Sequence, residues 1–407
     1  MAVGELRRKW TDLRGAALWP AAVLVLVQTL NGIWYGPQVT FFPVYLQEQL
    51  GLAPAVIGVV VSGALMAGMV AALFGGTLAE MLGSKWVLVC GLGFSAVGAL
   101  AFLVHTPGLV ALLWFAGGAG LALISVGGAS YLTRLSARQS LGVLASVYML
   151  SFTLGGVIGN PVGGAIIERR GFAAFGLAEL ALIGASALVA ILFMVYLKDR
   201  STGSTSVRAF WTGALPMTRR VRVRLLMGLR CLPTIFYGML TVLIPLLLNT
   251  LTGNKTLVAT YGAATLILAS AAQLAAGRAA DRWGGRRPTL VAYSTIILAG
   301  VGLAATAGTV WGLFLFGVLG VAAAWSLSTL MYVWVADGLA KPEHASSFGL
   351  LHAVWSISMI AGSLLGGWLV RSAAGLPFLL AGLFNIGSIF LALAYYGRIA
   401  PRQPAQE

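Results

Sequence analysis

Two short segments of this chain repeat one another at a distance of 201 residues, and the repeat restricts the possible folds more than any other feature. In each segment an acid, a glycine and a base follow at one spacing, between two long apolar stretches. The recurring residues are Gly76, Glu80, Gly83 and Lys85 in the first copy and Gly277, Asp281, Gly284 and Arg286, with Arg282, in the second. Such duplication is typical of polytopic membrane proteins built from two like halves, which can rock around a site between them.

The repeat extends well beyond these two loops. At a distance of 202 residues, Tyr35 returns as Tyr237 and Gly36 as Gly238, and at 207 residues Gly155 returns as Gly362. Leu30, Ile33, Pro43 and Leu46 also recur, as Leu232, Ile235, Pro245 and Leu248. The duplicated unit therefore covers most of each half of the chain.

The composition places this duplicated unit in a membrane. With 59% hydrophobic residues, 9% charged residues and a mean hydropathy of +0.92, the chain is neither a soluble domain nor disordered. Twelve apolar runs have about the 20 residues that a helix needs to cross a bilayer. They span 18–46, 52–78, 86–104, 108–133, 140–167, 172–197, 225–251, 256–276, 288–307, 310–335, 346–370 and 376–397. The sequence thus predicts an all-α membrane protein with twelve transmembrane helices in two pseudo-symmetric six-helix bundles.

The net charge of +15 reflects membrane topology, and no nucleic-acid partner is expected. With the amino terminus inside, 22 of the 26 Lys and Arg lie on the cytoplasmic side, and the outer side keeps Arg169, Arg170, Lys255 and Arg371. Cytoplasmic loops of membrane proteins carry such an excess of basic residues. We therefore expect a multi-pass protein of the cell (inner) membrane with both termini cytoplasmic, in contact with membrane lipids.

One long connection divides the chain. Residues 198–224 hold a run of Ser, Thr and Gly at 201–206 and a basic run at 219–224, which is typical of a cytoplasmic linker. The predicted domains are an N-terminal six-helix bundle at 1–197, this linker, and a C-terminal six-helix bundle with a short cytoplasmic tail at 225–407.

These residues resemble the major facilitator superfamily over the whole chain. The loop at 76–85 is similar to its G-x-L-A-D-R-x-G-R-K pattern, with Glu80 in place of the aspartate, and the copy at 277–287 is nearer to it. The fifth span resembles the G-x-x-x-G-P-x-x-G-G element of antiporters in that superfamily, with Asn160 where proline is expected. Trp114 stands where the family often has an arginine. The resemblance implies the major facilitator fold but no particular substrate, since one fold hosts many cargoes.

The two loops are expected to form a conformational latch. An acid and a base at helix ends can bridge to neighbouring helix termini in one conformation and release them in the other. The alternative is a plain loop whose basic residues only fix orientation. The glycines of the fifth and eleventh spans are expected to allow close helix packing: Gly155, Gly159, Gly163, Gly362 and Gly366.

Polar side chains share single faces of the first and seventh spans, at intervals of three and four residues. By resemblance, the first, fourth, seventh and tenth spans line a central cavity. The expected substrate-binding residues are Gln28, Asn31, Tyr35, Gln38, Thr234, Tyr237, Thr241, Trp325, Tyr332 and Trp355. The alternative role for such side chains is hydrogen bonding between helices.

None of the eleven acids lies in the middle of those four spans, and Asn31 stands where many proton-driven exporters of the resembled superfamily carry an acid. A charge at that depth is usually functional. His352 and Glu179 are therefore the candidates for proton coupling, with a structural histidine and a helix-end carboxylate as the alternatives. Arg230 is expected to extend to the membrane interface and pair with Asp337.

These observations favour a secondary active transporter of a small organic molecule, most consistent with export (efflux) by proton antiport and alternating access. An uncharged cavity suits neutral, amphipathic or weakly cationic cargo. The alternatives are a facilitator or importer of a neutral solute, a lipid or lysolipid flippase, and a non-transporting sensor or assembly factor. Neither a phosphate-binding loop, a metal-ligand cluster nor a nucleophile–base set is present, so no enzyme, cofactor or metal is expected. A monomer is expected.

The latch generates a first prediction. Asp281→Asn removes the charge but keeps the shape, so transport should slow while equilibrium ligand affinity stays within a few-fold. Turnover and ligand binding, measured on the same purified protein, check this. A large loss of affinity with unchanged turnover would contradict a latch.

Overall fold

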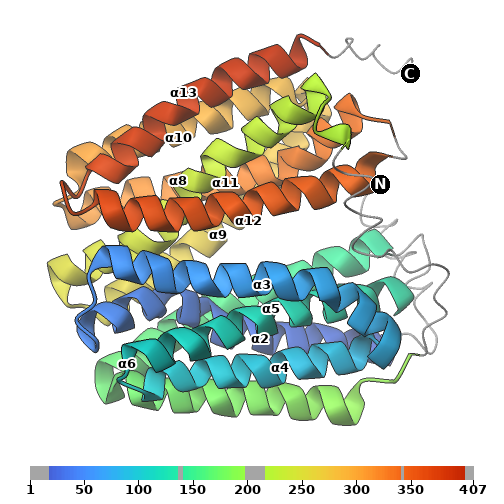
Figure 1. The fold of residues 1–407 in the computed structure, drawn as a ribbon, viewed down its shortest axis with the longest axis vertical. Coiled ribbons are helices and arrows are strands. Elements are labelled where there is room, and N and C mark those ends of the chain that lie inside the picture. Colours follow the sequence, from blue (N-terminus) through green and yellow to red (C-terminus); the bar gives the residue numbers. More distant parts are fainter. Residues whose placement is uncertain (1–17, 136–140, 198–215, 341–342, 399–407) are drawn as a thin grey trace. The chain divides into compact units, whose positions relative to one another are not determined.

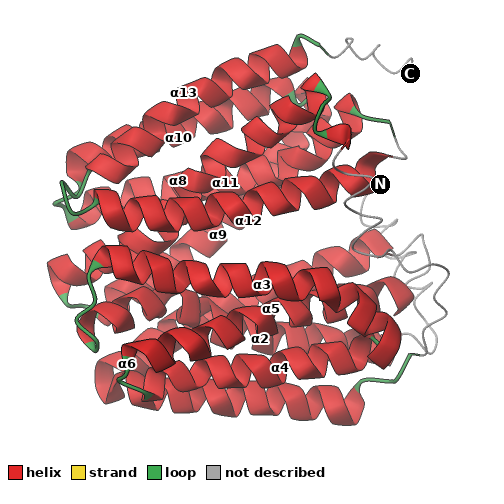
Figure 2. Cartoon of the chain, viewed as in Figure 1, coloured by secondary structure: helices red, strands yellow, loops and turns green. Residues whose placement is uncertain are grey.

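The computed structural model describes residues 18–135, 141–197, 216–340 and 343–398. Within these ranges the chain is helical and has no strand (Figure 2). Eleven of the described helices are long and apolar enough to cross a membrane. Helices suit this setting because every backbone N–H and C=O finds its partner within the same segment, which lipid cannot supply.

The helices follow the predicted apolar runs closely. The first half contains α2 (Leu18–Glu48), α3 (Pro54–Leu82), α4 (Ser84–Ala99) with the 3-10 turn η1 (Leu100–Leu103), α5 (Pro107–Leu135) and α6 (Leu141–Phe193). The second half contains α8 (Val221–Thr252), α9 (Lys255–Trp283), α10 (Arg286–Thr306), α11 (Val310–Gly338), α12 (His344–Leu369) and α13 (Leu376–Tyr396) (Figure 1).

Helix α6 contains two of the predicted spans. Its backbone leaves the helical conformation at Gly171, where φ is 81° and ψ is 175°. Only glycine adopts this conformation readily, because a side chain would clash with the backbone. The break falls between the predicted spans 140–167 and 172–197, so the twelve predicted membrane crossings are all accounted for.

The chain forms two compact units that depart from a simple division at the linker. The first comprises Met1–Ala53, Val59–Val207 and Gly253–Leu266, and the second comprises Pro54–Gly58, Arg208–Thr252 and Ile267–Glu407. The start of α9 thus belongs to the first unit and the start of α3 to the second. Helix α8 begins at Val221, inside the stretch predicted as linker, whereas residues 198–215 of that stretch lie outside the described residues.

Helix pairing inside each unit repeats. In the first unit α2 packs along α6, and α4 packs against both α5 and α6. In the second unit α8 packs along α12, and α10 packs against both α11 and α13 (Figure 1). These are equivalent pairs in the duplicated sequence, so the two units share one topology.

Glycines set the distance between α2 and α6. A Cβ atom on Gly155 would lie 2.2 Å from the carbonyl oxygen of Thr29, and one on Gly159 would lie 2.0 Å from that of Ile33. A Cβ on Gly163 would meet the Pro37 ring at 2.6 Å. The two backbones therefore approach more closely than any side chain allows, which is how helices associate in lipid.

The same contact recurs between α8 and α12. A Cβ on Gly362 would lie 2.2 Å from the carbonyl oxygen of Ile235, and one on Gly238 would lie 2.7 Å from that of Met359. A Cβ on Gly366 would be 3.0 Å from the Met239 side chain. Gly155 and Gly159 correspond to Gly362 and Gly366 in the repeat. Both halves therefore pack these two helices together through equivalent glycines.

The turns of the repeated loops also match. Gly83 has φ of 85° and Gly284 has φ of 73°, both in the left-handed region. Each glycine lets its loop reverse direction immediately before the next helix. The glycine recurs in both copies of the motif because this backbone geometry requires it.

The glycine contact generates a stability prediction. Gly155→Ala places a methyl group against the α2 backbone, so overpacking should destabilise the protein by about 1–3 kcal/mol. Gly184→Ala, in the same helix but facing open space, is the matched control and should leave stability unchanged or slightly raised. Thermal unfolding of the purified variants in detergent checks this. Equal midpoints for the two variants would contradict a sterically required glycine.

Candidate functional site

The predicted polar stripe of the first unit lies on α2 and is mostly buried. Gln28 is 8% exposed, Asn31 2% and Gln38 5%. The Asn31 amide donates to Gln28 Oε1 at 3.4 Å, while its own Oδ1 is buried without a hydrogen-bond partner. The stripe therefore holds a polar group that the protein itself leaves unsatisfied.

Aromatic rings flank this stripe. Tyr35 is half-buried, with its ring 5.8 Å from that of Trp34 and 5.7 Å from that of Phe152 of α6. Trp114 of α5 stacks on Phe42 with ring centroids 3.4 Å apart. At the place where the family often has an arginine, this chain thus has a packed indole.

The structure brings together two residues that the sequence singled out separately. Glu179, in the second part of α6, is 1% exposed, and its carboxyl lies beside the amide of Gln38. Neither carboxyl oxygen has a hydrogen bond of good geometry. The carboxyl is thus enclosed within the first unit, and the alternative of a helix-end carboxylate near the interface stays a prediction.

Asn160 is a further polar residue of the first unit, which the sequence marked only as a departure from a family pattern. It is 1% exposed, its amide donates to the Gly156 carbonyl at 2.9 Å, and its Oδ1 is buried without a partner. The Oδ1 atom lies beside Gly262, where a Cβ atom would be 2.5 Å away. The amide thus lies against the first turns of α9.

In the second unit the predicted residues gather around α8 and α11. Tyr237 is half-buried and close enough to Trp325 to hydrogen-bond with it, and Gln273 of α9 donates to the Trp325 carbonyl at 3.3 Å. The hydroxyls of Thr234 and Thr241 donate within their own helix, to the carbonyls of Arg230 and Gly238. Both hydroxyl protons are thus used within α8, and each hydroxyl oxygen can still accept a hydrogen bond.

Arg230 is the functional candidate that the sequence reading missed. The expectation that it extends to the interface and pairs with Asp337 is wrong, because the residue is 9% exposed and its Nη1 donates to Ser328 Oγ at 2.9 Å. A signal was available in the sequence. Arg230 precedes Thr234 by four residues, so it continues the polar face of α8, and it stands 202 residues after Gln28.

The remaining predicted residues of the second unit lie around this arginine. His352 and Tyr332 are exposed within the unit and close enough to the guanidinium to interact electrostatically. The His352 ring stacks on Trp355 at 5.4 Å, and the Tyr332 ring contacts Phe348 at 5.0 Å. A cation and four rings thus occupy one region of α8, α11 and α12.

The first latch loop contains a base that binds a helix end. Lys85 Nζ donates to the carbonyls of Ile191 and Met194, at 2.8 and 2.7 Å, where α6 terminates. A cation there complements the unpaired carbonyls and the negative end of the helix dipole. Among the described residues, the side chains of Glu80, Asp281, Arg282 and Arg286 make no hydrogen bond or ion pair, and the last three are exposed. Gly76 and Gly277 leave room for a side chain.

A second ionic group ties the start of α9 into the first unit. Lys255 Nζ forms an ion pair with Glu48 at the end of α2, and the Lys255 backbone N–H donates to Glu168 Oε2 at 2.8 Å. The two carboxylates lie at the amino end of α9, where the helix dipole favours negative charge.

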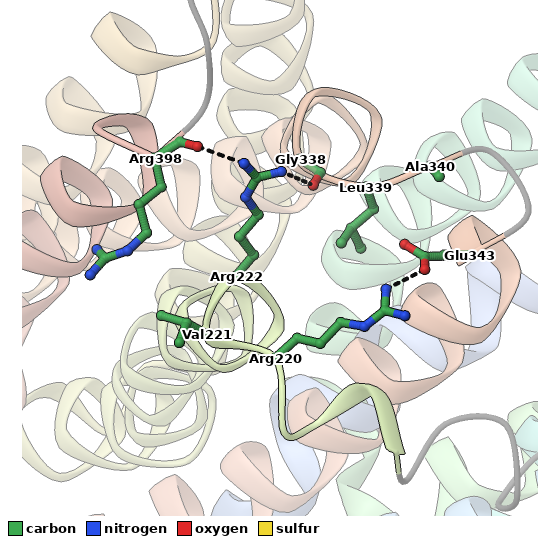
Figure 3. A pocket seen from close by; sticks show the side chains of 8 residues that line it. All are labelled: Arg220, Val221, Arg222, Gly338, Leu339, Ala340, Glu343 and Arg398. Carbon is green, nitrogen blue, oxygen red and sulfur yellow. Dashed lines mark hydrogen bonds and ion pairs between the residues drawn. The ribbon is translucent and has the colours of Figure 1, made fainter.

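A cavity of about 610 Å³ lies at the ends of α8, α11 and α13 (Figure 3). Arg222 bridges two of these ends by donating to the carbonyls of Gly338, at 3.4 Å, and Arg398, at 2.8 Å. Arg220 forms an ion pair with Glu343, and this hydrogen bond lowers the pKa of the Glu343 carboxyl. These basic residues, predicted as part of the linker, thus fasten the beginning of α8 to its own unit.

Among the described residues, no three His, Cys, Asp or Glu side chains are grouped closely enough to hold a metal ion.

Comparison with known proteins connects this architecture to a family. A family model described as the Major Facilitator Superfamily matches residues 24–337. Two curated relatives are tetracycline resistance proteins. The class G protein of Vibrio anguillarum is 30% identical over 165 residues, which is 39% of this chain and 40% of that protein. The class E protein of Escherichia coli is 30% identical over 161 residues, or 38% of each. The chain thus aligns with about two fifths of the length of these relatives.

Solved structures share the fold at low sequence identity. The nucleoside transporter NupG superimposes with a TM-score of 0.76 at 16% identity, over 93% of this chain and 98% of that one. A bacterial homolog of the human lysosomal transporter Spinster superimposes with a TM-score of 0.70 at 14% identity, over 94% and 96%.

The Lys85 contact generates a stability prediction. Lys85→Met removes two charge-assisted hydrogen bonds to the end of α6, so the protein should lose about 1–2 kcal/mol of stability. Glu80→Gln, five residues earlier in the same loop, is the control and should change stability by less than about 0.5 kcal/mol. Thermal unfolding in detergent measures both. A larger effect of Glu80→Gln would show that the acid, and not the base, holds this loop.

Proposed function

Since the chain belongs to the Major Facilitator Superfamily of membrane transporters, we propose that it exports a small organic molecule in exchange for protons. The single observation that carries this proposal is the buried carboxyl of Glu179. It is 1% exposed and makes no hydrogen bond of good geometry.

The chemistry of Glu179 suits a proton carrier. A carboxylate enclosed by apolar helices is costly unless it is paired, so a buried carboxyl without a cation favours its protonated form. When a conformational change admits water, the same group releases its proton. Its neighbour Gln38 belongs to the polar stripe of α2. A change in the charge of Glu179 therefore alters the electrostatic environment where substrate is expected to bind.

Two observations support export over uptake. The glycine element of α6 resembles the antiporter element, and the relatives with 30% identity are named for resistance to a drug. Uncoupled uptake is the competing function, because the middle of α2 carries Asn31 in place of an acid.

A flux assay separates these functions. Cargo is first identified by thermal-shift screening of the purified protein across sugars, nucleosides, organic acids, drugs and lipids. Its flux into proteoliposomes is then measured with a pH gradient and after nigericin collapses that gradient. Proton exchange requires flux to fall to the passive rate, and flux that is unchanged by nigericin would eliminate the antiport proposal.

The coupling residues generate a prediction for the same assay. Replacing Glu179 and His352 together by Gln should abolish gradient-driven flux, because both candidate proton carriers would then be removed. The double variant Glu343→Gln, His105→Gln is a matched control, since both of those side chains lie outside the membrane-spanning helices. Undiminished flux in the first double variant would refute the assignment.

A further inference from the structure

Arg230 is a buried cation inside a membrane-spanning helix. It lies within α8 and is 9% exposed. Burying a charged side chain is costly unless it is paired, and charges within membrane-spanning segments mark substrate or ion pathways. The position of Arg230 therefore requires either a partner in the protein or one supplied by a ligand.

The protein compensates this charge only in part. The one side-chain acceptor for the guanidinium is the neutral hydroxyl of Ser328, and the Nε–H is buried without any acceptor. No Asp or Glu within the described ranges forms an ion pair with it. A buried guanidinium with an unused donor and an unbalanced charge is unfavourable by itself and is stabilised by a bound anion.

Of the side chains near Arg230, one is fixed in place and two are exposed. The Tyr293 hydroxyl donates to the Leu229 carbonyl at 2.7 Å, so that ring is fixed in place. In contrast, Tyr332 is 59% exposed and His352 is also exposed, although both interact electrostatically with the guanidinium. The cation thus has two exposed neighbours, Tyr332 and His352, whose rings contact Phe348 and Trp355.

The internal repeat gives an independent reason to place Arg230 in the binding site. It occupies the position equivalent to Gln28, the first residue of the polar stripe on α2. It also continues the polar face of α8, four residues before Thr234. Both relations put the guanidinium on the face where ligand binding is expected.

We propose that Arg230 is the anion-recognition residue of the second unit and that the cargo is an aromatic organic carboxylate. The guanidinium offers a planar fork of donors that matches a carboxylate, and the surrounding rings fit an aromatic body. A single guanidinium balances one negative charge, which favours a monoanion over a phosphate dianion. This inference rests on the proposed function only in that the ligand is taken to be the transported molecule, and it replaces the expectation of neutral cargo.

Binding of matched acid and amide pairs tests the proposal without any transport assay. The probes are benzoate and benzamide, 3-phenylpropionate and its amide, and indole-3-acetate and its amide, titrated against the purified protein in a thermal-shift assay. We expect at least one carboxylate to raise the unfolding midpoint while its amide does not. No carboxylate-dependent shift in the wild-type protein would overturn the proposal.

Variants then assign the effect to Arg230. Arg230→Gln should weaken binding of the active carboxylate at least tenfold, as expected for loss of a charged hydrogen bond, and Arg230→Lys should restore part of it. Arg278→Gln, at an exposed position of α9, is the control and should bind like the wild type. Unchanged affinity in Arg230→Gln would overturn the proposal.

The stability of the unliganded variant separates binding from a structural role. Removing an uncompensated buried cation should leave the midpoint of Arg230→Gln equal to or above that of the wild type. A lower midpoint together with wild-type affinity would identify a structural arginine and overturn the proposal. If the protein binds the carboxylate but its flux does not depend on the pH gradient, this inference stands and proton exchange is rejected.

Discussion

Helices surrounded by lipid gain little from burying one apolar side chain against another, so their association depends on close approach of the backbones. In this protein that approach is made at glycine, between α2 and α6 and again between α8 and α12. It also fixes the rotation of α2 and α8. In both helices a residue of the polar stripe directly precedes a glycine that contacts the neighbouring helix: Tyr35 precedes Gly36, and Tyr237 precedes Gly238. One residue is roughly 100° of rotation, so the polar groups are turned away from the packed seam.

Much of the fold could be predicted from the sequence because it depends on local patterns and on the internal repeat. The repeat identified equivalent residues such as Gly155 and Gly362, and the structure places both of them against the backbone of the neighbouring helix. Hydropathy located the membrane crossings, including the two that meet at Gly171. These features depend on local sequence or on matching two copies of it. Neither requires knowing which helices from distant parts of the chain become neighbours.

The site depended on such neighbours and was therefore predicted less well. The pairing of Gln38 with Glu179 joins helices far apart in the sequence, and nothing in either segment indicates that they meet. The sequence predicted an interfacial position for Arg230 because the residue lies near the start of its apolar run. Its burial follows from Ser328 of α11 and from the packing of α8 against α11 and α12. The family resemblance predicts functional acids in the membrane-spanning helices, and it gives no indication of a buried base such as Arg230.

The two units share one topology but bury ionisable groups of opposite charge. The first encloses a carboxyl at Glu179 and the second a guanidinium at Arg230, each without an ion-pair partner among the described residues. A carboxyl that releases a proton and a cation that holds an anion are the two elements that exchange of a carboxylate for protons requires. If a monoanion leaves as one proton enters, two positive charges move inward in each cycle. A potential of 100 mV, negative inside, then adds about 4.6 kcal/mol to export, at about 2.3 kcal/mol per charge. An exchanger with this charge arrangement would be driven by the membrane potential as well as by the pH gradient.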